Sequence, residues 1–235
     1  MRLLVTRPQP DAERSAAALR ARGHAAVVAP LLRIEPVDDV EIGSEKFAAI
    51  LVTSANAAAV ARHRRFTELK NLPLLAVGER SAQAMRDVGF ADVVSAGGGM
   101  DELTRLATGR LSHGARLLYL AGAERSGDLA GDLAARNFAV QTVVVYRALA
   151  ADVLPPAAAE ALAVGIDGVL HFSKRSAEAY IKVAQAGGFA DSGINNPVHF
   201  CLSAQVAGPL TQAGAAKVRI AAGPDEAALF ALISG

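Results

Sequence analysis

The chain has 235 residues, of which 52% are hydrophobic, and its 24 basic and 23 acidic residues give a formal net charge of +1 at pH 7. This composition is that of a packed globular protein, which excludes a disordered chain and argues against a nucleic-acid protein dominated by phosphate contacts. Only 5% of the residues are aromatic and tryptophan is absent, so base stacking on aromatic platforms is not expected. A local basic cleft for an anionic small molecule stays compatible with this balance.

The chain has one cysteine, Cys201, so it contains neither an intrachain disulfide nor a CxxC metal or redox motif. Cys201 lies in an apolar stretch, where a free cysteine usually packs as a small hydrophobic side chain. The apolar run at the N-terminus is shorter than the roughly 7–15 residues of a signal peptide, and no stretch approaches the roughly 18 apolar residues of a membrane span. We therefore expect a cytoplasmic protein.

The N-terminal segment predicts a strand, a helix and a second strand. Residues 3–6 form a short continuous apolar run, which is typical of a strand buried on both faces of a parallel sheet. Pro8 and Pro10 delay the next helix to about residue 11, and alanine and leucine then recur at helical spacing up to residue 22. Gly23 suits the left-handed cap of this helix, and residues 25–32 predict the second strand.

The rest of the first half predicts further strands, each followed by a helix. Ser54 is the predicted N-cap of a helix that starts at Ala55, and Gly89 ends the next helix. The final helix of this half opens at Met100, after three glycines, with acidic residues in its first turn that suit the helix dipole. The predicted strands are residues 48–53, 74–77 and 92–94.

The second half of the chain repeats this order. Residues 2–33 match residues 116–147 at a constant offset, and two more pairs of segments match likewise: 47–54 with 166–173, and 77–98 with 202–223. Asn137 takes the place of Gly23, as expected because asparagine also tolerates the left-handed cap conformation. The predicted strands are residues 117–120, 140–146, 168–172, 198–202 and 217–220. The predicted helices are residues 128–136, one within 153–163 after a linker, one from Arg175, one that ends near Gly214, and one opened by Pro224-Asp225-Glu226.

Strands that alternate with helices predict an α/β protein with parallel sheets covered on both faces. The duplication predicts two similar domains, and a cleft between two domains is a frequent place for a ligand. A tandem split near residue 113 fits the repeat. Residues 30–37 and 143–150 also look like extended segments that could cross between the domains, and the periodicity leaves both arrangements open.

Several common site signatures are absent. The first strand–helix turn, residues 6–10, is not GxGxxG, and the chain has no GxxxxGK[ST], HExxH or GxSxG motif. Gly97-Gly98-Gly99 is better interpreted as a flexible turn than as a phosphate cradle, because its repeat counterpart has a single glycine. The histidines show no metal-ligand spacing; they are His24, His63, His113, His171 and His199.

Hydroxyl and basic groups follow the predicted strands. In a parallel sheet the carboxyl ends of the strands form the edge where ligands bind, and helix N-termini there suit carboxylates. Each serine has a second, compatible interpretation as a helix N-cap. The groups at this edge are Thr6, Arg7, Thr53, Ser54, Ser81, Arg125, Ser173, Lys174, Arg175 and Ser203.

These features together resemble the uroporphyrinogen-III synthase family over nearly the whole length. The segments that bear the resemblance are residues 4–8, 50–57, 76–78 with 81–82, 144–147 and 172–173, in this order and spacing. The resemblance implies an α/β fold of two flavodoxin-like domains with parallel sheets, joined by a two-stranded β ribbon, with a cleft between them. It implies residues 1–32 plus 150–235 as one domain, 38–143 as the other, and 33–37 with 144–149 as the ribbon.

The resemblance also implies a lyase of tetrapyrrole and haem biosynthesis. Its substrate would be the linear tetrapyrrole hydroxymethylbilane, which loses water and closes with inversion of ring D to give uroporphyrinogen III. It implies no metal or organic cofactor. From the composition and hydropathy we expect no nucleic-acid or membrane partner, and we expect a monomer. The alternative from a different class is a non-catalytic, two-lobed binding or regulatory protein for an anionic small molecule.

The resemblance assigns the residues of the site one by one. Tyr146 matches the family's tyrosine that faces the cleft and is the candidate acid. The alternative is a purely structural role as a half-buried tyrosine of a strand. Ser203 stands where the family usually has glycine, and Val206 stands where it has a hydroxyl. Ser54, Ser81 and Ser173 match hydroxyl positions that the family places in the cleft. Together with groups at the predicted strand ends, the predicted substrate-binding residues are Thr6, Arg7, Ser54, Ser81, Arg125, Ser173, Lys174 and Ser203.

Overall fold

A computed structural model describes residues 1–37, 40–43, 45–61, 66–125, 127–223 and 225–233. The chain divides into two compact units, residues 1–33 with 149–235 (unit 1) and residues 34–148 (unit 2). His63 and Pro224, which the sequence analysis considered, lie outside the described residues.

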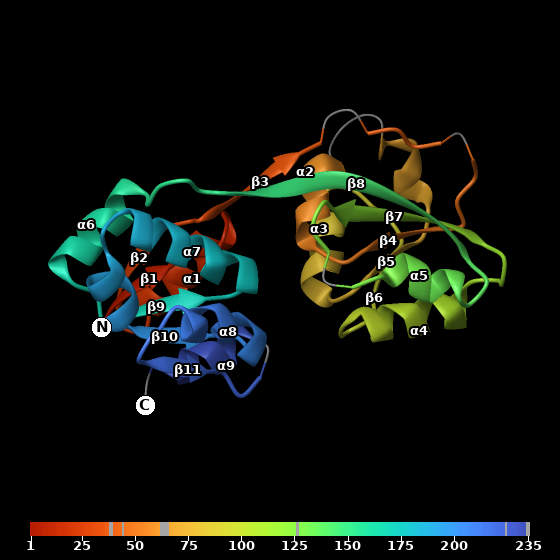
Figure 1. Cartoon of the computed structure of the whole chain (residues 1–235). Helices are drawn as coiled ribbons and strands as arrows, with labels where there is room; N and C mark the ends of the chain where they lie inside the picture. The colour runs from red at the N-terminus through yellow and green to blue at the C-terminus, as the bar shows by residue number, and fades with distance from the viewer. Residues whose placement is uncertain (38–39, 44, 62–65, 126, 224, 234–235) are drawn as a thin grey trace. The chain divides into compact units, whose positions relative to one another are not determined.

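Unit 1 is built on a five-stranded parallel sheet with helices on both faces (Figure 1). Its strand order is β11-β10-β9-β1-β2, which is the flavodoxin-like order when the strands are counted along the unit. The strands are β1 (Arg2–Val5), β2 (Ala25–Val28), β9 (Gly168–His171), β10 (Val198–Cys201) and β11 (Val218–Ile220). The helices are α1 (Asp11–Arg20), α6 (Pro156–Val164), α7 (Lys174–Ala186), the π-helix η4 (Ala190–Asn195), α8 (Ala204–Gln212) and α9 (Glu226–Ala231).

Two hydrophobic cores fill the faces of this sheet. One contains side chains of α6, α7 and α8, and the other contains side chains of α1 and α9. Because β1 and β9 contribute to both cores, their continuous apolar runs are buried on both sides, as the sequence predicts.

Unit 2 repeats the arrangement with a sixth strand, in the order β3-β8-β7-β4-β5-β6. Its strands are β3 (Leu32–Pro36), β4 (Ala49–Val52), β5 (Leu74–Ala76), β6 (Val93–Ser95), β7 (Arg116–Gly122) and β8 (Ala139–Ala150). Its helices are η1 (Ala55–Ala57), α2 (Ala58–Ala61), η3 (Glu68–Asn71), α3 (Glu79–Asp87), α4 (Met100–Arg110) and α5 (Leu129–Ala134). The strands β4 to β8 are parallel, and cores lie on both faces.

The chain passes between the units through β3 and β8, since the boundaries at residues 33/34 and 148/149 fall inside these strands. The amide of Val37 donates to the carbonyl of Val145, and the amide of Ala151 donates to the carbonyl of Leu31. These pairs advance in opposite directions along the two segments, so β3 and β8 are antiparallel.

The predicted helix caps are confirmed. Gly23 and Asn137 both have positive φ, +82° and +64°. Ser54 and Ser173 are N-caps whose side chains accept from backbone amides.

The largest difference from the predicted elements lies at residues 25–32. Here β2 ends at Val28, earlier than predicted, and β3 (Leu32–Pro36) lies within the extended segment predicted at residues 30–37. Pro30 stands between them, and its missing N–H cannot continue a strand ladder. The helix predicted from Ala55 also begins with a turn of 3₁₀-helix before α2.

Candidate functional site

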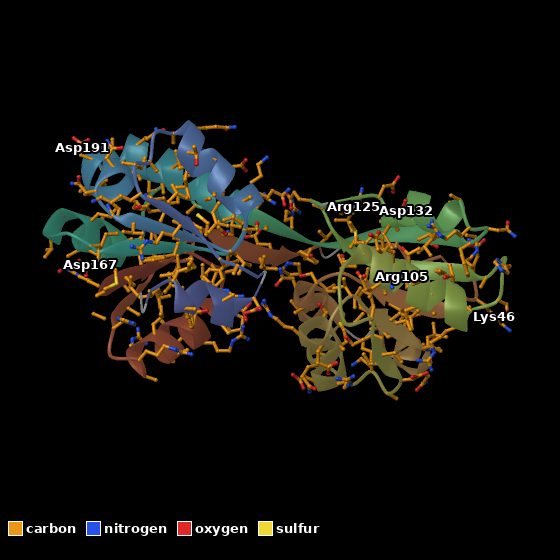
Figure 2. All side chains as sticks on the ribbon, turned by 90° about the horizontal axis from the view of Figure 1, so that it is seen from below. Lys46, Arg105, Arg125, Asp132, Asp167 and Asp191 are labelled. Carbon is orange, nitrogen blue, oxygen red and sulfur yellow. The ribbon has the colours of Figure 1, made fainter. Side chains whose placement is uncertain are left out.

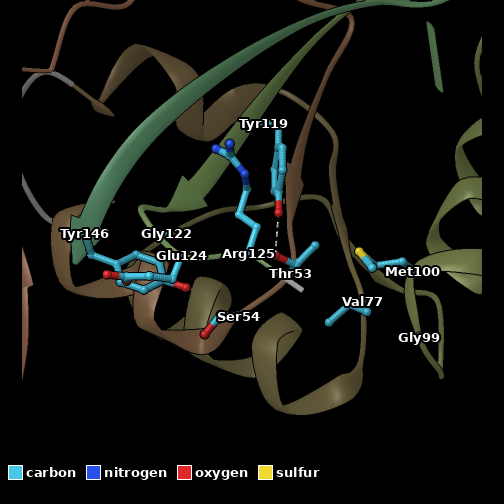
Figure 3. Close-up of a pocket in the computed structure, with 10 residues that line it drawn as sticks. All are labelled: Thr53, Ser54, Val77, Gly99, Met100, Tyr119, Gly122, Glu124, Arg125 and Tyr146. Atoms are coloured by element: carbon cyan, nitrogen blue, oxygen red, sulfur yellow. Dashed lines mark hydrogen bonds between the residues drawn. The ribbon is translucent and has the colours of Figure 1, made fainter. Parts of the chain in front are cut away.

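A pocket of about 450 Å³ opens in unit 2 at the carboxyl edge of its sheet (Figure 3). This volume lies within the range of small-molecule sites. The wall combines hydroxyls, two phenols and one residue of each charge with small and apolar groups. The lining residues are Thr53, Ser54, Val77, Gly99, Met100, Tyr119, Gly122, Glu124, Arg125 and Tyr146.

Tyr146 lies on β8, opposite Gly122 of the neighbouring strand β7, where a bulge interrupts the pairing. A Cβ atom at Gly122 would lie 2.7 Å from Cζ and 2.8 Å from the hydroxyl oxygen of Tyr146. The bare Cα of Gly122 therefore provides the space in which the tyrosine ring packs. Tyr146 as a whole residue is 9% exposed, so it is largely buried while its ring still lines the pocket.

Burial raises the pKa of the Tyr146 phenol above its ordinary value of 10, because the charged form would lose its water shell. The Ser54 hydroxyl, which can hydrogen-bond to the phenolate, acts in the opposite direction and lowers this pKa. Ser54 also caps the following turn, since its Oγ accepts from the amide of Asn56 at 3.2 Å. Tyr146 is thus a protonated donor at neutral pH with a group ready to stabilise its conjugate base.

A second phenol, Tyr119 of β7, reaches the same pocket. Its hydroxyl lies 2.8 Å from Oγ1 of Thr53, which directly follows β4 (Figure 3). The sequence analysis noted Thr53 but not Tyr119. The only signal was a polar-tipped aromatic residue within the apolar run of β7.

Charge in the pocket comes from Arg125 and Glu124, which follow β7. The charge of Glu124 further raises the pKa of Tyr146, because two negative charges near each other are unfavourable. Of the predicted binding residues, the structure brings Ser54 and Arg125 together with the predicted acid Tyr146 in one pocket.

The glycine turn before α4 does not present a free helix N-terminus. The carboxylate of Glu102 accepts a hydrogen bond from the amide of Gly99 at 2.7 Å. This hydrogen bond is the main reason that the pKa of Glu102 lies below its ordinary value. The anion position at the start of α4 is therefore occupied by the helix's own side chain, which favours the interpretation of residues 97–99 as a turn.

In unit 1, Ser173 and Ser203 follow the neighbouring parallel strands β9 and β10, so both lie at the same sheet edge. Ser173 accepts from the amide of Ser176 at 3.1 Å, and Ser203 accepts from the amide of Val206 at 3.4 Å. Lys174 is exposed and lies 3.7 Å from Glu178. Both serines are helix caps, and whether they also bind a ligand stays a prediction.

The side chains of Thr6 and Arg7 make polar contacts with other residues of unit 1. The fully buried Thr6 hydroxyl donates to the carbonyl of Leu170 at 2.8 Å. The Arg7 guanidinium lies 3.2 Å from Glu226, 3.5 Å from Asp11 and 4.2 Å from the centre of the Phe172 ring. Burial lowers the pKa of Arg7, against the opposing charge of Glu226.

Ser81 is also away from the pocket wall. It lies in the first turn of α3 and is 6% exposed. Its repeat counterpart Val206, in α8, is 5% exposed and packs in the core. The same inward position thus holds a hydroxyl in one unit and methyl groups in the other.

A smaller pocket of about 250 Å³ lies between α4 and α5, and Figure 2 labels Arg105 and Asp132 in its wall. Its charges cancel, so it offers no net attraction for an ion. It is lined by Asp101, Thr104, Arg105, Asp132 and Arg136. Among the described residues, no group of three or more His, Cys, Asp or Glu side chains could hold a metal ion.

The two flavodoxin-like units and the polar pocket define the class as an α/β protein with a pocket suited to a polar small molecule. A family model described as Uroporphyrinogen-III synthase HemD matches residues 13–231. The chain belongs to the uroporphyrinogen-III synthase family, whose members are cyclising lyases of tetrapyrrole biosynthesis with a linear tetrapyrrole as substrate. The main functional prediction from the sequence is thereby confirmed.

Solved structures agree on the fold. A uroporphyrinogen-III synthetase from Helicobacter pylori aligns with a TM-score of 0.70 and 19% identity, covering 100% of this chain and 99% of that one. A mutant uroporphyrinogen III synthase from the extremely thermophilic bacterium Thermus thermophilus aligns with a TM-score of 0.54 and 15% identity, covering 100% and 97%. A search of the curated proteins found no match. Within the described residues, no helix is both long and apolar enough to cross a membrane.

Proposed function

We propose that the unit 2 pocket holds the reacting end of hydroxymethylbilane and that Tyr146 is the acid. The Tyr146 proton passes to the substrate hydroxyl, the C–O bond breaks, and water leaves as the pyrrole nitrogen supplies electrons, which leaves a phenolate and a cationic azafulvene that is still protonated on its nitrogen. Attack by the substituted carbon of ring D and rearrangement through a spiro intermediate give the inverted product. The proton lost when the product becomes aromatic returns to the phenolate.

The observation that supports this role is the setting of Tyr146 in the pocket wall. Burial keeps the phenol protonated, and Ser54 stabilises the phenolate that remains after proton transfer. Both effects serve an acid that must give and regain one proton. Arg125 supplies a positive charge for one of the many carboxylates of the substrate.

We propose that Ser173, Lys174 and Ser203 bind further substrate carboxylates. They share one sheet edge, and Lys174 is exposed and basic. For Thr6, Arg7 and Ser81 we keep the predicted binding role as a proposal, although their observed contacts are structural.

We propose the predicted domain boundaries as well, residues 1–32 plus 150–235 and 38–143. The unit boundaries at 33/34 and 148/149 support them. We further propose a cytoplasmic monomer without a nucleic-acid or membrane partner, supported by the near-neutral charge and the scarcity of aromatic residues.

A coupled assay tests the proposed function. Hydroxymethylbilane is generated in situ, the purified chain is added, and the products are oxidised and separated into type I and type III isomers. We expect mostly type III. Formation of the spontaneous type I product alone would contradict the enzyme assignment and favour a binding protein.

The variant Gly122→Ala is expected to lower the rate of type III formation by about tenfold or more and to destabilise the fold by about 1–3 kcal/mol. The new methyl group would overlap the Tyr146 ring, which must move away from the pocket. Type III kinetics and urea unfolding measure the two effects.

The matched control is Gly109→Ala, in α4, where a Cβ atom meets nothing within 4 Å. This variant is expected to keep the rate and to gain as much as about 1 kcal/mol of stability from helix propensity. Equal kinetics in both variants would show that the position of the Tyr146 ring does not matter.

A further inference from the structure

The hydroxyls of Thr53 and Tyr119 form a fixed pair in the pocket wall. Leu51 of β4 lies in register with Tyr119 of β7, so the end of β4 brings Thr53 to the phenol. The Tyr119 ring packs in the hydrophobic core and is 3% exposed, whereas both residues line the pocket (Figure 3). The core therefore holds the ring, and the 2.8 Å hydrogen bond holds its oxygen.

The Thr53–Tyr119 pair has one O–H group that can donate a hydrogen bond to a ligand. Each hydroxyl has one hydrogen, and their mutual hydrogen bond uses one of the two. Within the described part of the chain, neither hydroxyl makes another hydrogen bond. Whichever group donates to the other, one O–H donor is left at the pocket wall.

The surroundings of this donor favour an anionic oxygen as its partner. The Arg125 guanidinium lines the same pocket and can only donate, whereas the Glu124 carboxylate there can only accept. The Tyr146 phenol is also close, since a charge on Tyr119 would oppose its ionisation. The O–H of the pair and the Arg125 guanidinium are two donors that suit a carboxylate, which only accepts hydrogen bonds, while the Tyr146 phenol is left for the substrate hydroxyl.

We propose that the Thr53–Tyr119 pair binds a carboxylate oxygen of the substrate and that Tyr119 is a specificity-determining residue of this chain. The inference rests on the proposed function, because that function places a polycarboxylate in this pocket. It assigns Tyr119 a binding role that is separate from the proton transfer assigned to Tyr146.

The test compares Tyr119→Phe, Thr53→Val, their double variant and Thr53→Ser. Two quantities are measured: kcat and KM for type III formation, and the affinity for uroporphyrin III, a polycarboxylate probe that needs no turnover. The control is Tyr180→Phe, which removes a buried phenol of unit 1 that donates to the carbonyl of Gly193.

We expect Tyr119→Phe and Thr53→Val each to raise KM and the probe Kd by about tenfold, with kcat within about twofold. The double variant should lose more than either single variant, since each single variant keeps one O–H donor that has lost its fixed position, whereas the double variant has none. Thr53→Ser should restore the affinity, and Tyr180→Phe should keep KM although it unfolds more easily.

The outcomes separate this inference from the proposed function. Wild-type KM and probe affinity in Tyr119→Phe would overturn the inference even if type III product forms. If the parent chain forms only type I product but binds the probe, and the probe affinity falls in Tyr119→Phe, the carboxylate site stands and the enzyme assignment falls. Absence of both turnover and probe binding in the parent chain would overturn both.

Discussion

Tyr146→Phe is expected to slow type III ring closure by about 10–100-fold and to change the free energy of unfolding by no more than about 1 kcal/mol. The effect lies at the lower end for a general acid because azafulvene formation from the hydroxymethyl group is intrinsically easy. The ring stays in place because phenylalanine keeps the packing over Gly122, so only the proton and the contact with Ser54 are lost.

The pH dependence adds a second readout. Because burial raises the pKa of the Tyr146 phenol above 10, the acid stays protonated from pH 6 to about 9, and the parent rate should not fall there through loss of this proton. Rates of the parent chain, Tyr146→Phe and the Tyr180→Phe control are measured across this range with the isomer assay. Unchanged turnover in Tyr146→Phe would remove the acid role and leave the family membership intact.

Features set by local chemistry could be predicted from the sequence. The N-cap role of Ser54 follows from its place between an apolar strand and a helical pattern. The left-handed conformation of Asn137 follows from its match with Gly23 in the repeat. Even the edge of the sheet that holds the pocket follows from the parallel strands, since loops after β4, β5 and β7 supply half of its lining residues.

Contacts between distant residues could not be predicted in this way. Arg7 stands at a strand end, where a ligand contact was expected, but its partner Glu226 is 219 residues away along the chain. The Thr53–Tyr119 bond joins residues 66 positions apart, and no local pattern indicates it. For Ser81 a signal existed, because the side chain of its repeat counterpart Val206 is apolar and so pointed to a buried position.

The unfolding free energy of the chain is expected to fall steeply as pH drops below about 6.5, because of two histidines buried in unit 1. His171 and His199 are fully buried on β9 and β10, with Nε2 of His171 3.0 Å from Nδ1 of His199. Burial lowers the pKa of both, and the neighbouring His199 lowers that of His171 further.

Hydrogen bonding explains why the pair stays neutral. Nε2 of His199 lies 2.9 Å from the carbonyl of Ile194, which can only accept, so this nitrogen bears the proton and Nδ1 of His199 accepts from His171. Nδ1 of His171 is then an unprotonated nitrogen, and it has no partner among the described residues. Protonation there would bury both a charge and an unsatisfied donor, beside the aromatic ring of Tyr180.

The sign follows from proton linkage. The unfolded chain binds protons at these histidines below about pH 6.5, whereas the folded chain does not, so acid favours unfolding. Each imidazole that stays neutral in the fold costs about 1.4 kcal/mol of stability per pH unit below this value. The loss begins above the range in which ordinary carboxylates titrate, which separates the two effects.

Urea unfolding of the parent chain, His171→Phe and the exposed-histidine control His113→Gln between about pH 5 and 7.5 measures this dependence. His171→Phe is expected to lose stability at the upper end of this range, because Nδ1 of His199 loses its donor, but to have a shallower slope at the acidic end. His113→Gln should keep the parent slope. Parallel curves for the parent chain and His171→Phe would show that the buried pair does not remain neutral in the fold. His171 lies two residues before the proposed binding residue Ser173. A change in the affinity for uroporphyrin III over the same pH range would therefore extend the effect from stability to substrate binding.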